Sequence, residues 1–313
     1  MLWLWPSSDY LLLPDKAQPV APLVRVRGAK PDTNGGGIYF VAVVERRARL
    51  FEQLFPSIHD GATVVPASEI NGNLNERQRR TVDLSAMARS QDIAAAVALE
   101  ELHYKVRIVG QGALIVQILE NAPAAESLLP GDVVTAVDGT AVRRIADLRR
   151  LIGRHRPGQV VRLTVRRSGS LRTVSVKTAA DPADKTRPVI GVIVEQAASI
   201  HLPFPVTIDA GSIGGPSAGL AFALDLVQQL GRDVDRGYKI AATGELGLDG
   251  SVQPIGGVEQ KTIGAREAHV DAFLVPAGDN ARDARKYAHG LRIIPVQTFR
   301  QALRALATLP RKR

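Results

Sequence analysis

A serine and a lysine are the residues of this 313-residue chain whose surroundings best suit covalent chemistry. Ser217 lies between small residues in the stretch 214–219 (GGPSAG), directly ahead of an apolar helical run, and Lys261 follows a second glycine pair in GGVEQK. A serine hydroxyl needs a base within hydrogen-bond reach, and a lysine can be that base only when its pKa falls from about 10.4 toward roughly 7–8. The two residues therefore predict a Ser–Lys dyad, a variant of the Ser-His-Asp arrangement.

The segment around Lys261 fits this role. Ile255, Val258 and Ile263 flank the lysine, and no further positive residue follows before Arg266. Burial of such a segment removes water and disfavours the charged ammonium, which lowers the lysine pKa. The glycine pairs of the two motifs are expected to let two backbones approach closely.

Other residues near the pair are expected to assist it. The backbone around Ser217, at Gly215, Pro216 and Ala218, is expected to form an oxyanion site, because a helix start favours negative charge. Thr243, in ATGE at the end of an expected strand, is expected to hold the lysine amine toward the serine.

Each motif also has a plain structural interpretation. GGPSAG alone is a common helix entry in which the serine is only an N-cap, and Lys261 alone reads as a solvated helix residue. A Ser-His-Asp triad that uses His201 or His269 also stays open at this point.

Composition narrows the class of protein. Apolar residues make up 45% and charged residues 23%, as in folded, soluble proteins, and the length suggests two or three domains. The absence of cysteine excludes disulfides and thiol nucleophiles, and the six histidines show no paired ligand spacing, so we expect neither a metal nor another cofactor. The net charge of +9 comes with no nucleic-acid-binding motif, so we expect a solvated basic surface and no nucleic-acid partner.

Alternating strand and helix patterns predict a mixed α/β (α+β) fold in three segments. Residues 1–104 are expected to form an α/β segment without a motif of its own, with helices near 46–56 and 83–104. Residues 105–180 are rich in strand patterns and turns, and residues 181–313 alternate strands with helices.

The middle segment resembles a PDZ domain. The residues that carry the resemblance are GQGALI at 110–115 and LLPGDVVTAVDGTAV at 128–142. PDZ domains bind extended peptides by adding a strand to an open sheet edge. The resemblance implies that this edge begins at the residues Gly112, Ala113, Leu114 and Ile115.

The last segment resembles the proteolytic domain of Lon proteases. GGPSAG, ATGEL and PIGGVEQK occur in the order and spacing of that family, and the match runs from about 190 to 309. The resemblance implies that Ser217 is the nucleophile, Lys261 the general base and Thr243 a support of the lysine. It also implies a fold related to the second domain of ribosomal protein S5. Most Lon proteins have an acidic residue where this chain has Gly214.

The combination resembles the bacterial PDZ-containing Lon-like serine proteases of peptidase family S16. No intact G-x-x-x-x-G-K-[ST] phosphate loop is present, since GGVEQKT has Gln260 where the second glycine belongs. The resemblance implies ATP-independent cleavage of unfolded or tail-exposed proteins, a homohexamer, and a position on the extracytoplasmic side of the cell membrane. The opening MLWLWP (1–6) would then be the remnant of a membrane anchor, with Trp3 and Trp5 at the headgroups. A catalytically silent PDZ adaptor that only binds peptides is the alternative.

Overall fold

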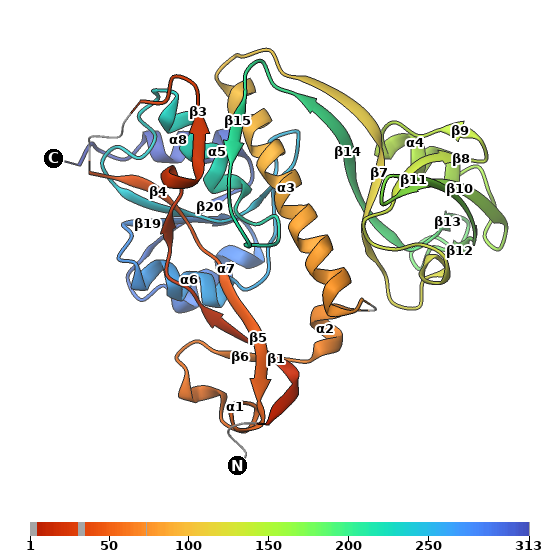
Figure 1. Cartoon of the computed structure of the whole chain (residues 1–313), viewed down its shortest axis with the longest axis horizontal. Coiled ribbons are helices and arrows are strands. Elements are labelled where there is room, and N and C mark those ends of the chain that lie inside the picture. The colour runs from red at the N-terminus through yellow and green to blue at the C-terminus, as the bar shows by residue number, and fades with distance from the viewer. Residues whose placement is uncertain (1–4, 31–34, 73, 313) are drawn as a thin grey trace. The chain divides into compact units, whose positions relative to one another are not determined.

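The structure of the chain is a computed structural model that describes residues 5–30, 35–72 and 74–312. The chain divides into two compact units, one of residues 1–106 with 202–313 and one of residues 107–201 (Figure 1). The second unit is thus inserted into the chain of the first. No helix in the described ranges is long and apolar enough to cross a lipid bilayer.

A five-stranded sheet forms the centre of the first unit. Its order is β2-β4-β16-β19-β20, and all neighbours are parallel except β2 and β4. The strands are β2 (Gln18–Pro19), β4 (Gly37–Phe40), β16 (Lys239–Ala242), β19 (Ala272–Pro276) and β20 (Arg292–Val296).

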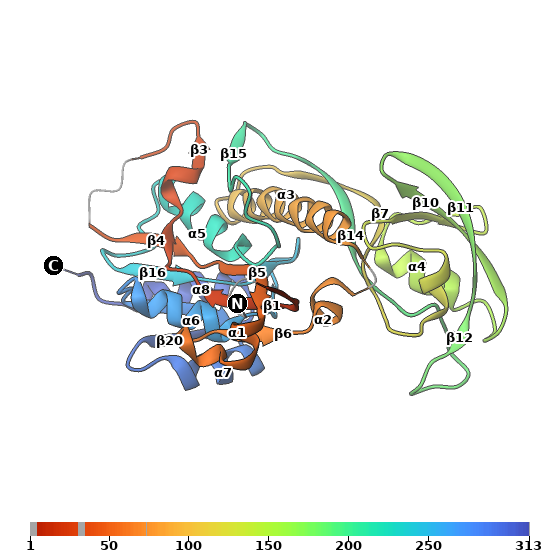
Figure 2. The same cartoon turned by 60° about the horizontal axis from the view of Figure 1, so that its bottom comes forward.

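Side chains alternate along the strands, so apolar residues project from both faces of this sheet. Helices cover both faces and bury these residues. On β16, Ile240 and Ala242 pack into one core and Ala241 into another. The first core includes residues of α3 (Glu76–Glu101), α5 (Gly219–Gln229) and α8 (Phe299–Ala307). The second includes residues of α6 (Val258–Glu267) and α7 (Asp279–Tyr287), and Figure 2 shows α6 and α7 together on one side of the sheet.

Smaller elements complete the first unit. A three-stranded sheet has the order β5-β1-β6, and β15 pairs with β3 and β17 with β18. These elements are β1 (Pro6–Pro14), β3 (Val24–Val26), β5 (Val43–Arg49), β6 (Thr63–Val65), β15 (Val206–Ile208), β17 (Glu245–Leu246), β18 (Val252–Gln253), α1 (Leu50–Leu54) and α2 (Ala67–Asn71).

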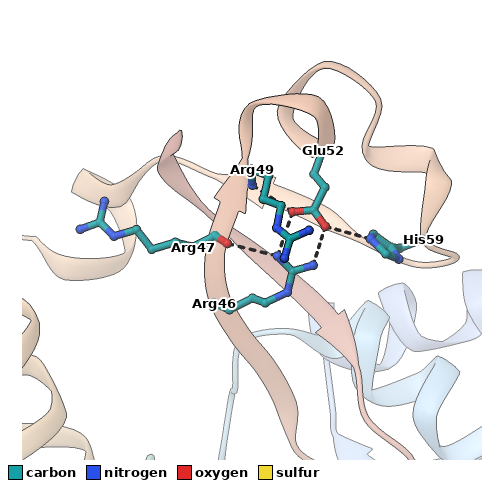
Figure 3. Close-up of polar contacts among 5 residues, drawn as sticks. All are labelled: Arg46, Arg47, Arg49, Glu52 and His59. Carbon is teal, nitrogen blue, oxygen red and sulfur yellow. Dashed lines mark hydrogen bonds and ion pairs between the residues drawn. The ribbon is translucent and has the colours of Figure 1, made fainter. Parts of the chain in front are cut away.

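A buried carboxylate fastens α1 to β5 (Figure 3). Glu52 accepts two hydrogen bonds from the Arg46 guanidinium at 2.5 and 2.8 Å, one from the Arg49 backbone N–H at 2.9 Å, and lies 3.0 Å from His59 Nε2. The hydrogen bonds from Arg46 are the main cause that lowers the pKa of Glu52 to about 2. The helix predicted over 46–56 is wrong in its first part. Strand β5 continues to Arg49, where it pairs with β1, and α1 begins only at Leu50.

Helix α3 also differs from its predicted range, since it begins at Glu76. Asn75 and Gln78 form a reciprocal capping box, in which each side-chain oxygen accepts the backbone N–H of the other residue, at 2.9 and 3.0 Å. Residues 76–82, which precede the predicted start of the helix, are thus its first part. Thr298 caps α8, because its hydroxyl accepts the Gln301 N–H at 3.1 Å.

The second unit contains a sheet of order β11-β10-β8-β7-β14, to which β9 adds at β8. A hairpin joins β10 to β11 through Ser168 and Gly169, both at positive φ. The elements are β7 (Arg107–Ile118), β8 (Val133–Val137), β9 (Thr140–Ala141), β10 (Val160–Arg167), β11 (Ser170–Lys177), β12 (Ala179–Ala180), β13 (Pro188–Val189), β14 (Val192–His201) and α4 (Ile145–Ile152).

These units differ from the three predicted segments. The N-terminal segment is not separate, because β4 lies in the central sheet beside β16. The second compact unit extends past the boundary predicted at position 180 to His201, because β14 pairs with β7 along its whole length. Of the predicted anchor remnant, residues 1–4 lie outside the described residues, and Trp5 is 65% exposed.

Candidate active site

The central sheet explains how Ser217 and Lys261 meet. Ser217 lies two residues before α5, which covers one face, and Lys261 lies in the first turns of α6, which covers the other. Thr243 directly follows β16. Sites in parallel sheets form beyond the carboxyl ends of the strands. The three side chains come together at this edge.

The serine and lysine are in direct contact. Lys261 Nζ donates to Ser217 Oγ at 2.7 Å. Lys261 is only 5% exposed, and this burial lowers the pKa of its amine to about 7. At that pKa about half of the amine is neutral near pH 7 and able to accept a proton. The plain interpretations do not apply, because Lys261 is not solvated and the Ser217 side chain does not cap α5.

Thr243 contacts the serine and not the lysine. Its buried hydroxyl donates to the backbone carbonyl of Ser217 at 3.1 Å, and the Gly244 N–H donates to the same oxygen at 2.8 Å. Among the described residues, the Lys261 amine donates its side-chain hydrogen bond to Ser217 Oγ and none to Thr243. The expected contact of Thr243 with Lys261 is thus replaced by one that fixes the Ser217 backbone.

The three residues predicted to form an oxyanion site are not equivalent. Pro216 has no N–H, and the Gly215 N–H donates to the Asp83 carbonyl at 2.9 Å. The Ala218 N–H belongs to the same planar trans peptide as the Ser217 carbonyl, so the two groups point in opposite directions. Because that carbonyl is held at the end of β16, Ala218 is the residue of the three that can donate to an oxyanion.

The glycine pairs approach other parts of the chain and not each other. A Cβ on Gly214 would lie 2.9 Å from the Asp83 Cβ of α3. Gly257 has φ +66°, and a Cβ there would lie 2.8 Å from Val43 Cγ2. Gly214 and Gly257 therefore allow the N-terminal segment to pack closely against the two motifs. The sequence alone did not reveal this contact.

The N-terminal segment also fixes α6. A Cβ on Gly264 would lie 1.9 Å from the Asp15 carbonyl oxygen, and the Ala17 N–H donates to the Gly264 carbonyl at 3.2 Å. Gln260 donates to the Gly61 carbonyl at 2.9 Å. No motif in the sequence indicates these supports, and a glycine inside a helix is the one local signal for a close approach.

A cleft of about 910 Å³ opens at the dyad, within the first unit. Three ion pairs lie along its wall, from Arg79 to Glu45 at 3.0 Å and to Asp83 at 3.3 Å, and from Arg47 to Glu76 at 2.5 Å. The rest of the wall combines apolar side chains, which suit an extended peptide, with the charged Asp15, Arg80 and Glu245. Its apolar side chains include Leu12, Phe40, Val41, Val43, Ile70, Leu84, Met87, Ile213 and Ile255.

The predicted peptide-binding edge at Gly112–Ile115 is wrong. These residues lie inside the sheet, since β7 pairs with β8 on one side and with β14 on the other. Gly112 itself is close-packed, because a Cβ there would lie 2.3 Å from the Val134 carbonyl oxygen. The edge strand is β14, for which β7 is the sole partner among the described strands.

Neither histidine proposed as an alternative base lines the cleft. His269 is exposed after α6, and His201 ends β14 in the second unit. Among residues 5–30, 35–72 and 74–312, no cluster of three or more histidine or acidic side chains has the arrangement of a metal site.

Comparison with known proteins agrees with both resemblances. A family model described as the Lon protease (S16) C-terminal proteolytic domain matches residues 177–308, and a PDZ domain model matches residues 88–178. A solved PDZ domain from an SdrC-like protein of Listeria innocua is 26% identical with a TM-score of 0.25, and the match covers 26% of this chain and 92% of that one.

Several curated proteins are related in sequence. Lon protease 1 of Bdellovibrio bacteriovorus is 32% identical over 170 residues, which are 53% of this chain and 20% of that protein. Lon protease 2 of Bacillus subtilis is 34% identical over 111 residues, which are 36% of this chain and 19% of that protein. A probable periplasmic serine endoprotease DegP-like of Pseudomonas fulva is 36% identical over 96 residues, which are 30% of this chain and 18% of that protein.

The chain thus spans about a fifth of the length of these curated relatives. It has mixed helices and strands, and a PDZ domain precedes the matched proteolytic domain in the sequence. The chain thus carries, behind a PDZ domain, a domain that matches the S16 proteolytic domain of Lon proteases.

Proposed function

We propose that this chain is a serine endopeptidase that hydrolyses peptide bonds of protein substrates through a Ser217–Lys261 dyad. The observation that carries the proposal is the 2.7 Å contact between Lys261 Nζ and Ser217 Oγ, made by a lysine whose burial lowers its pKa to about 7. Acyl transfer by serine requires a base within hydrogen-bond reach of the hydroxyl, with a pKa near the pH at which the enzyme operates.

In the first half of the reaction, Ser217 Oγ attacks the substrate carbonyl carbon while its proton passes to the neutral Lys261 amine. The oxyanion that forms accepts a hydrogen bond from the Ala218 N–H. The Lys261 ammonium then gives its proton to the leaving amine, the peptide C–N bond breaks, and an acyl-enzyme remains. Water attacks this ester while Lys261 again takes and returns one proton, which frees the acid and Ser217.

The test is cleavage of an unstructured protein, labelled casein, by the wild type and by the variants Ser217→Ala and Lys261→Ala. Each substitution is expected to lower kcat/KM by about 10⁴-fold or more while the circular dichroism spectrum stays unchanged. Substantial cleavage by either folded variant would exclude the dyad. Binding of casein without any turnover by the wild type would favour the silent adaptor.

We propose that this cleavage needs no ATP, because the sequence has no intact phosphate loop. The nearest string, GGVEQKT, contains Lys261 itself, whose amine contacts Ser217. The casein assay is expected to give equal rates with and without ATP and Mg²⁺. A rate that rises severalfold with ATP would contradict this part of the proposal.

We propose that the PDZ domain binds the tail of a protein substrate along the β14 edge. The edge begins beside Gly191, which has φ +73°, and its Ile193 is 45% exposed. A free strand edge offers backbone donors and acceptors to an extended peptide.

Two matched variants test which edge binds. Ile193→Lys is expected to weaken, at least tenfold, the binding of a fluorescein-labelled decapeptide with an apolar C-terminal residue. Leu171→Lys is the control, because Leu171 is 68% exposed on β11, at the other end of the same sheet. Equal affinities of the wild type and Ile193→Lys would rule out the β14 edge.

We further propose that the protein acts as a homohexamer on the extracytoplasmic side of the cell membrane, without a nucleic-acid partner. This placement follows from the resemblance to bacterial PDZ-containing Lon-like proteases. Light scattering of the purified protein and protease accessibility of the protein in its native cells test it. A monomer, or protection from external protease in intact spheroplasts, would oppose it.

A further inference from the structure

The backbone on either side of Ser217 is held by two different elements. On one side the Ser217 carbonyl accepts hydrogen bonds from Thr243 and Gly244, at the end of β16. On the other side the carbonyl of Pro216 accepts a hydrogen bond from the hydroxyl of Ser90, at 2.8 Å. Ser90 lies in the middle of α3, more than 120 residues before the loop.

Helix α3 follows the loop closely over two turns. The Asp83 carbonyl accepts the Gly215 N–H at 2.9 Å. A Cβ on Gly214 would lie 2.9 Å from the Asp83 Cβ, and one on Gly219 would lie 2.8 Å from Ser90 Oγ. The loop has glycine at both places where a side chain would push it away from α3.

The direction of the Ser90 hydroxyl is unusual for a helix. Hydroxyls inside helices commonly donate to the carbonyl four residues earlier. Thr81 of α3 and Thr262 of α6 do so, at 2.9 and 2.7 Å. Ser90 is 3% exposed and directs its hydroxyl to the loop instead. A buried hydroxyl needs a hydrogen-bond partner, so its bond to a distant carbonyl holds that carbonyl in one orientation.

We propose that Ser90 is a positioning residue for the nucleophile, a proposal that rests on the proposed function of the dyad. Its hydroxyl fixes the Pro216–Ser217 peptide plane, as Thr243 and Gly244 fix the next plane. With both planes fixed, the Cα–Cβ bond of Ser217 has one direction, and Oγ lies 2.7 Å from Lys261 Nζ. Misplacement of a reacting atom by about 1 Å can lower the rate about 100-fold.

The central experiment is the steady-state kinetics of Ser90→Ala on a fluorogenic peptide that the wild type cleaves. We expect kcat to fall 10- to 100-fold with KM within twofold of the wild type, because the loop loses its orientation and the apolar cleft remains. Ser90→Thr keeps a hydroxyl and is expected to cleave faster than Ser90→Ala. Ser85→Ala is the control, since it removes an exposed hydroxyl from the same helix and is expected to match the wild type.

A second readout follows the nucleophile without a substrate peptide. The rate at which a small fluorophosphonate labels Ser217 is expected to fall with kcat in Ser90→Ala and to stay at the wild-type value in Ser85→Ala. Gly214→Ala, which pushes the loop from α3, is expected to lower the same rate, and it replaces Ser90→Ala if that variant does not fold.

The inference fails if folded Ser90→Ala keeps kcat and labelling within twofold of the wild type, or if Ser90→Thr is no faster than Ser90→Ala. A lower melting temperature with unchanged kcat would likewise show a purely structural role. Failure of the proposed function is separate, because the wild type itself would then neither cleave peptides nor react with the fluorophosphonate.

Discussion

Two stretches of the first unit contribute to the site in different ways. Residues 202–313 carry every motif and supply the reacting atoms of Ser217 and Lys261. Residues 5–106 carry no motif, yet α3 holds the serine loop, and the Asp15 carbonyl lies against α6. The reacting residues can be recognised in the local sequence because catalysis needs particular residue types. The residues that support the site cannot be recognised in this way, because almost any residue can supply a backbone carbonyl or close packing.

The pH dependence of cleavage tests the reacting stretch, and outside the dyad substitutions it has the largest expected effect on rate. Because burial lowers the pKa of Lys261 to about 7, kcat/KM should be level above about pH 8 and fall about tenfold per unit below pH 7. At pH 5 it should be about 100-fold below the plateau. The measurement is kcat/KM on a fluorogenic peptide from pH 5 to 9, and a profile flat through pH 7 would contradict a buried lysine base.

The same lysine is expected to cost stability, which Lys261→Met would reveal. The folded pKa of about 7 lies below the ordinary value of 10.5, so the unfolded chain binds more protons between these values. The penalty is complete below pH 7, about 5 kcal/mol as an upper bound, and disappears as the pH rises through 10.5. Urea unfolding should show an inactive but more stable variant at pH 6, with a smaller gain at pH 10.

The control for this variant is Lys239→Met, which removes an exposed lysine from the same unit. It should change the free energy of unfolding little at either pH. A loss of stability in Lys261→Met at pH 6 would mean that the hydrogen bond to Ser217 Oγ more than offsets the cost of burying the ammonium.

Gly264→Ala tests the supporting stretch. Alanine normally stabilises a helix by about 1 kcal/mol relative to glycine. Here its Cβ would lie 1.9 Å from the Asp15 carbonyl oxygen, so we expect a loss of about 3 kcal/mol in urea unfolding at pH 7.5. Gly256→Ala is the matched control, since its Cβ would meet nothing within 4 Å and should be nearly neutral. A neutral or stabilised Gly264→Ala would show that the N-terminal segment does not constrain α6.

Much of the dyad could be predicted from sequence, and its supports could not. Ser217 precedes a helix and Lys261 lies near the start of another, and each lies in a glycine-rich motif whose order and spacing resemble the Lon proteolytic domain. The partner of Thr243 was mistaken, because a hydroxyl at a strand end can reach either neighbour. Ser90 gave no signal, since its acceptor is a backbone carbonyl far along the chain.

The PDZ edge shows the same limit in the second unit. The pattern of β7 resembles a peptide-binding strand, but strand order depends on which distant strand pairs with it. The strand β14 begins more than 70 residues later and occupies that edge of β7. The resemblance could therefore identify the domain and not its free edge.

The smallest expected effect concerns Glu52, which holds α1 to β5 within the supporting stretch (Figure 3). Its pKa is lowered to about 2, so the carboxylate adds stability above about pH 4.5 that is lost as the pH falls toward 2. Glu52→Gln should cost about 2 kcal/mol in urea unfolding at pH 7 and much less at pH 3, whereas the exposed Glu69→Gln should change neither value. Glu52 does not line the cleft, so kcat should stay within twofold even as stability falls. A drop in kcat as large as that of Ser90→Ala would mean that support of the site extends through α1 as well as α3.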